Sequence, residues 1–309
     1  MAQLSRPLRW IPHVGVVAVG VSLAMLPPTH ASAGTVMKIA HQTANDYQDE
    51  IAHRLAALAG EKSGGYIRGQ VFSGAQLGPT QQQQEGVIHG VIEVAIQPSG
   101  AMTSVVREFG ILDLPFLFRD DEEQNAVLNG AGGEALRSVA ERQGFIVLSF
   151  FPGGFRDFAT VFPLRRVDDF RGRKFRVIES PELIGMIESW GGIGIPMPFP
   201  EIYTALQQRT IDGLDNAPDT IAALKFHEPA RYYTITRHGA WSTVIVASRR
   251  WFMTLPPHVQ TAVREAAQQV SREALQIRQR WVAWALETVE RDGASISRMA
   301  PAELERMEA

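Results

Sequence analysis

The chain has 309 residues, a formal net charge of −3 and no cysteine. The lack of cysteine excludes disulfides, thiol catalysis and thiolate metal sites, so the fold must be stabilised by its core alone. Acidic residues outnumber basic ones, and no Lys/Arg cluster with interleaved aromatic residues occurs, which argues against a nucleic-acid partner.

The first 33 residues have the pattern of a secretory signal peptide. Arg6 and Arg9 give a positive start, residues 14–26 form an apolar run, and residues 31–33 (ASA) form a cleavage site. The alternative is a membrane anchor, but this run of 13 residues is shorter than the roughly 20 that span a bilayer. We expect a soluble, exported mature chain with a net charge of −5, because the leader removes two arginines and no acidic residue.

Strands and helices alternate in the first part of the mature chain. The pattern predicts a strand at 35–42, a helix near 46–63, a strand at 66–72, a helix at 80–90 and a strand at 91–97. This βαβαβ order predicts a parallel sheet with right-handed crossovers. An apolar loop at 113–118 and a helix over 120–143 that breaks around Gly130–Gly133 come next.

A second α/β pattern follows a glycine pair. The strand 145–151 runs into Gly153-Gly154, where we expect the chain to cross between two lobes. The pattern then predicts strands at 173–178, near 193–197, 210–214 and 241–248, and helices at 181–190, 200–208, 218–226 and 254–293. Two α/β lobes joined by two or three crossing strands place the best cleft between the lobes, at the strand ends.

Catalytic and metal motifs are missing from the sequence. It contains no G-x-S-x-G elbow, no H-E-x-x-H, no Walker sequence and no complete G-x-G-x-x-G. The eight histidines are scattered, with no pair at ligand spacing. These observations give little support for an enzyme, a metal site or a cofactor.

Arginine and amide groups stand out at the predicted strand ends of the second lobe. Arg156 follows the proposed crossing, Arg176 lies inside a strand among apolar residues, and Asn216 ends the stretch TIDGLDN. A guanidinium offers two parallel N–H donors to the two oxygens of a carboxylate, and an amide can satisfy a remaining lone pair. The three residues therefore predict a carboxylate site at the floor of the cleft.

Each candidate also has a purely structural interpretation. A charged residue in a strand is usually paired or exposed to solvent, so the alternative partners of Arg176 are Glu179, Glu201 and Asp215. Arg156 can be an exposed loop cation, and Asn216 a turn residue. Phe199 and Trp241 can be cleft walls or ordinary core aromatics. Position alone does not decide between these interpretations.

Four linked stretches resemble the substrate-binding proteins of TRAP transporters, of the DctP type. They are AQLGPTQQQQEGVIHGVIEVAI (75–96), LDLPFLFRDDEE (112–123), DDFRGRKFRVIES (168–180) and PMPFPEIYTALQQRTIDGLDNAPDTI (196–221). The resemblance implies a two-lobed periplasmic binding protein fold, with parallel-rich sheets flanked by helices and a long C-terminal helix. We expect a first lobe of 34–153 plus about 242–281, and a second lobe of 154–241 plus about 282–309.

The resemblance also assigns roles to the second-lobe residues. In the family, the arginine of the K-x-R-V strand grips the ligand carboxylate, and that position is Arg176 here. The earlier G-x-R arginine matches Arg156, and the asparagine that ends DG-x-x-N matches Asn216. Phe199, after PMP, matches an aromatic residue that often touches ligand.

First-lobe contacts are weaker candidates. Gln97 and His41 lie at strand exits that often contribute side chains in the family, and Trp241 is a further candidate wall. The chain departs from the family at two positions, since Arg209 stands where Gly is common and Asp215 where Glu is common. The second departure puts the exact lining of the cleft in doubt.

The resemblance implies a non-enzymatic periplasmic receptor that delivers an organic acid to TRAP membrane permease subunits and uses no cofactor. The alternatives are a receptor of an ATP-driven importer, a periplasmic lyase or hydrolase on the same scaffold, and a ligand sensor. We expect a monomer, with a dimer through the long final helix as the alternative.

Overall fold

The computed structural model describes residues 34–309, and the predicted signal peptide lies outside these described residues. Within this part of the chain the strands form one nine-stranded sheet, in the order β2-β1-β3-β8-β4-β7-β5-β6, with β9 paired to β8. The strands are β1 (Thr35–Ala40), β2 (Ile67–Phe72), β3 (Val94–Pro98), β4 (Phe145–Thr160), β5 (Lys174–Val177), β6 (Ile193–Pro196), β7 (Gly213–Asn216), β8 (Tyr232–Ser248) and β9 (Ser295–Arg298).

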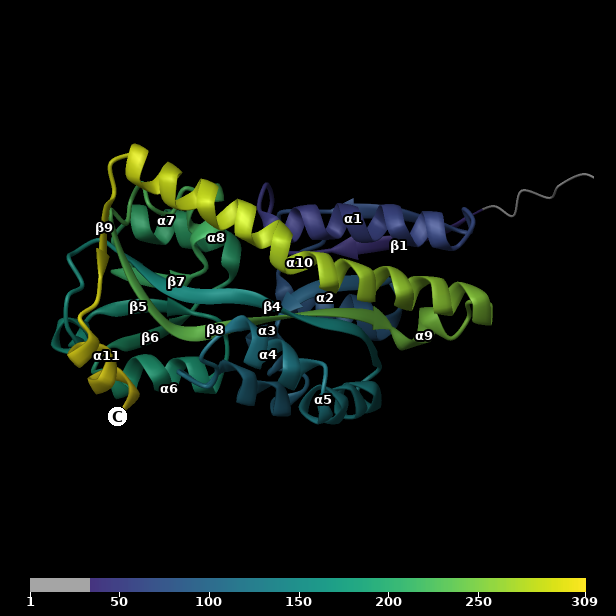
Figure 1. Ribbon diagram of the computed structural model, residues 1–309, viewed down its shortest axis with the longest axis horizontal. Coiled ribbons are helices and arrows are strands. Elements are labelled where there is room, and N and C mark those ends of the chain that lie inside the picture. Colours follow the sequence, from purple (N-terminus) through teal and green to yellow (C-terminus); the bar gives the residue numbers. More distant parts are fainter. Residues whose placement is uncertain (1–33) are drawn as a thin grey trace, which may run out of the picture. The chain divides into compact units, whose positions relative to one another are not determined.

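Helices cover the sheet. The α-helices are α1 (Tyr47–Lys62), α2 (Thr80–His89), α3 (Ser99–Met102), α4 (Asp121–Leu128), α5 (Ala131–Arg142), α6 (Pro181–Ser189), α7 (Ile202–Gln207), α8 (Pro218–Ala223), α9 (Arg249–Phe252), α10 (Pro257–Arg291) and α11 (Pro301–Glu308). Three 3₁₀ turns complete the set: η1 (Arg107–Asp113), η2 (Val167–Phe170) and η3 (Phe199–Glu201). Figure 1 shows α1, α7, α8 and α10 on one face of the sheet and α4, α5 and α6 on the other.

The sheet consists of two parallel groups joined by two long antiparallel strands. β2, β1 and β3 pair in parallel, as the βαβαβ order predicted, and β7, β5 and β6 form a second parallel group. β4 and β8 pair with each other in antiparallel register and run through both groups (Figure 1). The predicted α/β class with flanking helices and a long C-terminal helix is therefore confirmed.

The two long strands were predicted too short. The strand expected at 145–151 continues to Thr160, because Gly153-Gly154 makes an irregularity within β4 and does not end it. The register against β8 shifts between Pro152 and Gly154, and Gly154 has a φ of 101°, which glycine adopts at little cost. The strand expected at 241–248 begins at Tyr232, ahead of a turn-like Arg237 with a φ of 49°.

Other boundaries also moved. The strand expected at 210–214 is Gly213–Asn216, and that expected at 91–97 begins at Val94. Strand β9 and helix α11 were not predicted. Helix α1 begins where Asp46 caps it, since its carboxylate accepts a hydrogen bond from the Asp49 amide.

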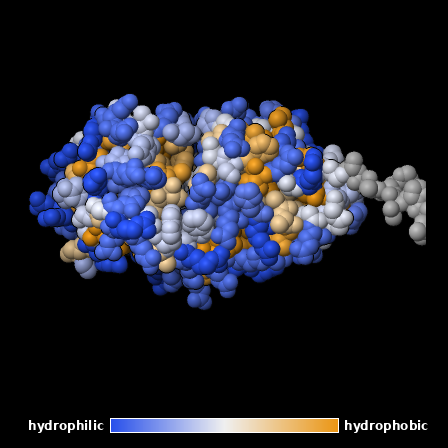
Figure 2. Space-filling model, turned by 90° about the horizontal axis from the view of Figure 1, so that it is seen from above, coloured by the Kyte–Doolittle hydropathy of each residue, from blue (hydrophilic) through white to orange (hydrophobic). Residues whose placement is uncertain are grey.

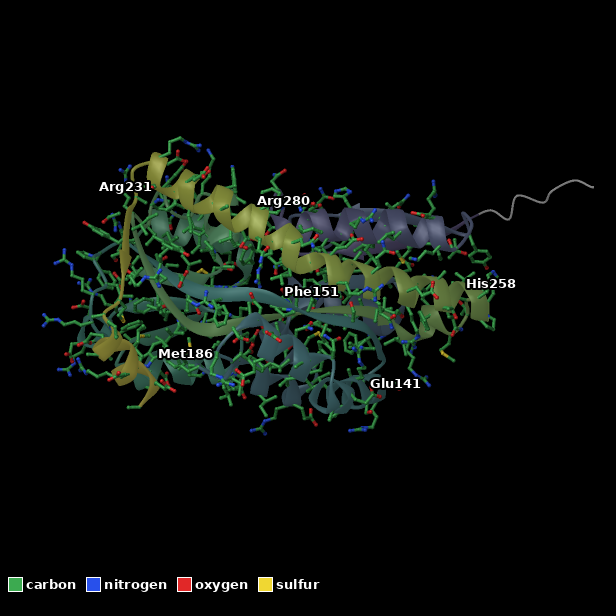
Figure 3. All side chains as sticks on the ribbon, viewed as in Figure 1. Glu141, Phe151, Met186, Arg231, His258 and Arg280 are labelled. Atoms are coloured by element: carbon green, nitrogen blue, oxygen red, sulfur yellow. The ribbon has the colours of Figure 1, made fainter. Side chains whose placement is uncertain are left out.

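The buried apolar residues form four clusters, two in each part of the sheet. In the part with β1 and β3, one cluster lies under α1 and the first half of α10 and the other under η1, α4 and α5. In the part with β5 and β7, one lies under α6 and the other under α7, α8 and the end of α10. Figure 3 marks Phe151, which belongs to the cluster beneath α10, on β4 near the middle of the sheet.

Candidate ligand-binding site

A small cavity lies where the two parallel groups of strands meet. Its volume is about 40 Å³, and its wall is formed by Gln42, Thr43, Gln48, Thr80, Ile96, Pro98, Ala101, Arg176, Ile178, Phe199, Asn216, Thr220 and Trp241. Typical ligand pockets measure roughly 300–1,000 Å³, so an organic acid enters only if these walls move apart.

Arg176 is the one charged side chain in the wall contributed by residues 34–309. Its Nε donates to the Met197 carbonyl oxygen at 3.1 Å, and its guanidinium lies 5.5 Å from the centre of the Phe199 ring. Burial, followed by the charge of Arg156, lowers the pKa of Arg176 to about 9. The side chain therefore remains a cation at neutral pH. Within the described chain it forms no ion pair with Glu179, Glu201 or Asp215, the acids considered as partners.

Three buried N–H groups in this wall have no acceptor among residues 34–309. They are Nη1 of Arg176, Nδ2 of Asn216 and Nε1 of Trp241. Each side chain is at most 6% exposed, so bulk water does not replace the missing partners. A buried donor without an acceptor costs roughly 1–3 kcal/mol, more if it is charged. Donors of this kind around a single cavity suit a ligand that supplies several acceptor oxygens, as a carboxylate does.

Arg156 does not line the cavity and has a protein partner. Its Nε and Nη2 donate to the two carboxylate oxygens of Asp215, at 2.6 and 2.8 Å, and its guanidinium stacks 4.8 Å from the Trp241 ring centre. His238 Nε2 lies 3.1 Å from the same carboxylate. Burial opposes ionisation of Asp215, but Arg156 and His238 hold the pKa of that carboxyl well below its usual range. Arg156 was predicted to bind the ligand, but it does not line this cavity and is half of a buried ion pair. The alternative of an exposed loop cation is wrong, because the residue is 4% exposed.

Gln97 and His41 do not line the cavity. Gln97 is fully buried beside Gln84, whose amide donates to it at 3.0 Å, while its strand neighbours Ile96 and Pro98 face the cavity. Alternate residues of a strand point to opposite faces, which accounts for this placement. His41 is also fully buried, with Nε2 at 3.2 Å from Asp49.

Sequence reasoning missed the neutral polar residues of the wall. These are Gln42, Thr43, Gln48, Thr80 and Thr220. All but Thr220 lie in the segment from β1 to α2, either just after a strand or at the start of a helix. Polar residues at such positions were the sequence signal that could have identified them.

Two buried carboxyl groups lie next to that polar part of the wall. Thr43 donates to Asp46 at 2.9 Å, and the Thr220 hydroxyl lies 3.4 Å from the other oxygen of Asp46. Neither carboxylate oxygen of Asp219 has a hydrogen-bond partner within the described range. Burial, followed by the charge of Asp46, raises the pKa of Asp219 to about 8, and burial also raises that of Asp46.

Several hydrogen bonds join the two parts of the sheet around the cavity. Gln81 on α2 donates to Glu179 after β5 at 2.8 Å, and Thr220 on α8 reaches Asp46 before α1. Arg280 on α10 donates to Glu50 in the first turn of α1 at 2.7 Å, and Figure 3 marks this arginine near α1. Separation of the cavity walls would break the first two bonds.

The described residues provide no alternative metal or membrane site. No three His, Asp or Glu side chains between Gly34 and Ala309 lie together as a metal-binding group. No helix in this part of the chain is long and apolar enough to cross a bilayer.

Comparison with known families shows the family to which the chain belongs. Residues 39–309 match the family model of bacterial extracellular solute-binding proteins, family 7. The chain belongs to this family. The matching relatives YiaO and DctP are periplasmic binding proteins. The family and fold are those of solute-binding proteins and not of enzymes.

Known members resemble this solute-binding protein over most of its length. The 2,3-diketo-L-gulonate-binding periplasmic protein YiaO of Escherichia coli is 30% identical over 78% of this chain and 74% of its own. The sugar acid binding protein DctPAm of Advenella mimigardefordensis, solved with galactonate, has a TM-score of 0.87 at 26% identity and covers 89% of both chains. A TRAP periplasmic solute-binding protein of Shewanella oneidensis, solved with succinate, has a TM-score of 0.86 at 25% identity, covering 89% and 91%. These relatives confirm the predicted resemblance to TRAP receptors.

Proposed function

We propose that this protein is the periplasmic receptor of a TRAP-type transporter and that it captures an organic acid by its carboxylate. The three unpaired N–H donors of Arg176, Asn216 and Trp241 around one cavity carry the proposal. A carboxylate placed there supplies both the missing counter-charge of Arg176 and the missing acceptors. Phe199, against the Arg176 guanidinium, forms an apolar wall for the carbon chain of the acid.

Binding proceeds by closure of two lobes in this proposal. The first lobe is 34–153 plus about 242–281, and the second is 154–241 plus about 282–309. The four apolar clusters support this division, since the first-lobe clusters use α10 up to Ile277 and a second-lobe cluster uses it from Ala285. The acid binds Arg176 in the open form, and its greater affinity for the closed form drives closure.

We infer that the bound acid is released unchanged to the TRAP membrane subunits. The family and the fold support this inference, since both are those of solute-binding proteins and not of enzymes. We further infer a monomer without a cofactor. Figure 2 shows hydrophilic surface interrupted by several hydrophobic patches on the face that carries α1 and α10, so a dimer through the long helix remains the alternative.

Thermal unfolding in the presence of candidate acids tests this function. A ligand at 100 times its Kd adds about 2.7 kcal/mol, which corresponds to a rise of about 5–10 °C in the unfolding midpoint for a chain of this size. The screen contains sugar acids, dicarboxylates, 2-oxo acids and aromatic acids, with the corresponding neutral sugars as controls. Stabilisation by neutral sugars and by no acid would refute the proposal. Recovery of the ligand unchanged after prolonged incubation tests the absence of turnover.

A further inference from the structure

The charges around the cavity distinguish between acids with one carboxylate and acids with two. Arg176 is the one cationic side chain in the wall formed by residues 34–309. A second cation, Arg156, lies close enough that its charge lowers the pKa of Arg176, but it does not line the cavity and stacks on the Trp241 ring at 4.8 Å. Whether Arg156 can serve a second carboxylate therefore depends on its own partners.

Arg156 is neutralised by the protein. Asp215 occupies its Nε and Nη2 in a two-point pair at 2.6 and 2.8 Å, and both residues are at most 4% exposed. The planar fork of a guanidinium meets one carboxylate in this way, so a ligand carboxylate would have to displace Asp215. Displacement would leave Asp215 buried without its cation, which is strongly unfavourable.

The other polar residues of the wall are uncharged, and two buried carboxyl groups of the protein lie next to them. Gln42, Thr43, Gln48, Thr80 and Thr220 present amides and hydroxyls, which bind hydroxyl or oxo groups of a ligand. Thr43 and Thr220 contact Asp46, and Asp219 precedes Thr220. A second carboxylate on this side would find no cation in the wall that the described residues form.

We infer that this site, as the carboxylate site proposed above, selects hydroxylated acids with one carboxylate over the matching dicarboxylates. Asp215 is the residue that determines this specificity, because it cancels the charge of Arg156. The family relationship does not decide the matter, since the similar structures contain galactonate in one case and succinate in another.

Matched ligand pairs test the inference by calorimetry on the mature protein. Erythronate and meso-tartrate differ only in whether the last carbon is a hydroxymethyl or a carboxylate, and galactonate and galactarate differ in the same way. The pair 4-hydroxybutyrate and succinate extends the test to unbranched acids without the chain hydroxyls. The second carboxylate of a dicarboxylate would be buried without a cation. In each pair that binds, we therefore expect the Kd of the monocarboxylate to be at least about 100-fold lower than that of the dicarboxylate. Equal or tighter binding of the dicarboxylate would overturn the inference and leave the proposed function intact. If no carboxylic acid of any class binds, the proposed function fails, and the inference fails with it.

The Asp215→Asn variant tests the role assigned to Asp215. It removes the charge that neutralises Arg156 while keeping the side-chain shape, so the preference for the monocarboxylate should fall by about tenfold or more. The double variant Arg156→Gln/Asp215→Asn removes both charges and should return the preference toward that of the wild type. Asp212→Asn, on the partly exposed carboxylate three residues earlier, is the matched control and should leave the ratio unchanged. An unchanged ratio in a folded Asp215→Asn protein would refute this role. If that variant fails to fold, the double variant decides: a preference for dicarboxylates in it would also refute the role.

Discussion

Arg176 donates its Nε to the main-chain carbonyl of Met197 at 3.1 Å, across the pairing of β5 with the end of β6. The guanidinium lies against the Phe199 ring, and its Nη1 has no acceptor among residues 34–309. The cation is thus positioned by a neutral group and has no protein counter-ion within the described chain. Replacement of Arg176 by an uncharged residue should therefore lower the ligand affinity and raise the stability of the ligand-free protein.

Replacement of Arg176 by methionine tests this opposition. We expect the unfolding midpoint of the ligand-free protein to rise by a few degrees, because an uncompensated buried charge is removed and the apolar volume is kept. Ligand binding, measured by calorimetry, should weaken at least about 100-fold, since the loss of a buried charge partner costs about 3–5 kcal/mol.

Lys174→Ala is the control, because Lys174 is an exposed cation on the same strand. It should leave the affinity within about twofold of the wild type. Wild-type affinity in Arg176→Met would contradict the role of Arg176, and so would an equal loss in Lys174→Ala.

The indole N–H of Trp241 is predicted to bind the ligand. Trp241→Phe keeps an aromatic ring over Arg156 but removes the unpaired Nε1 donor. A hydrogen bond to a charged group contributes about 1.5–3 kcal/mol, so affinity should fall by roughly 10- to 100-fold. Trp284→Phe, which changes a tryptophan that is 40% exposed, should have no effect. An unaltered affinity in Trp241→Phe would show that this donor does not face the ligand.

The Arg156–Asp215 pair is predicted to stabilise the fold through mutual compensation. Arg156→Ala leaves Asp215 buried beside His238 alone, so we expect the free energy of unfolding to fall by about 3–5 kcal/mol in denaturant titrations. The double variant Arg156→Gln/Asp215→Asn should recover most of this loss, because neither charge remains. Additive losses in the double-mutant cycle would contradict the pairing.

Two buried carboxyl groups predict a pH dependence of stability. Burial raises the pKa of Asp113 to about 7 and that of Asp219 to about 8, from ordinary values near 3.8. Between about pH 4 and pH 8 the native state therefore holds protons that the unfolded state has released. Their contribution to the free energy of unfolding falls as pH rises through this window, by up to about 1.4 kcal/mol per pH unit for each group.

Denaturant titrations of Asp219→Asn and the wild type at pH 5, 6, 7 and 8 measure this contribution. The variant cannot ionise at this position, so its advantage over the wild type should grow as pH rises. Asp49 and Asp215, whose pKa values are lowered, act oppositely and lose their stabilisation only as pH falls below about 4. A difference between the two proteins that stays constant from pH 5 to pH 8 would contradict the assignment.

Local patterns predicted the order of the main strands and helices from β1 to α10. Together with the family resemblance, they predicted Arg176, Asn216, Phe199 and Trp241 as site residues, and these four line one cavity. They also predicted an exposed Arg209, which lies just after α7 with a φ of 59°. This left-handed conformation favours glycine and explains why the resembling family commonly has glycine there.

The remaining features depend on long-range register and could not be predicted. The partner of Arg156 is 59 residues away and is set by the antiparallel pairing of β4 with β7. The first four residues of β3 are all buried, so no alternation indicated which face Gln97 would occupy. The proton-holding carboxyl groups of Asp113 and Asp219 arise from tertiary burial, which the sequence pattern does not report.

A crystal structure of the protein with the acid that stabilises it most tests the central claim directly. We predict one ligand carboxylate within hydrogen-bond distance, about 2.7–3.2 Å, of Arg176 Nη1 and of at least one of Asn216 Nδ2 and Trp241 Nε1. The Arg156–Asp215 pair should remain intact beside it. A ligand carboxylate bound elsewhere, with Arg176 still lacking an acceptor, would contradict the account.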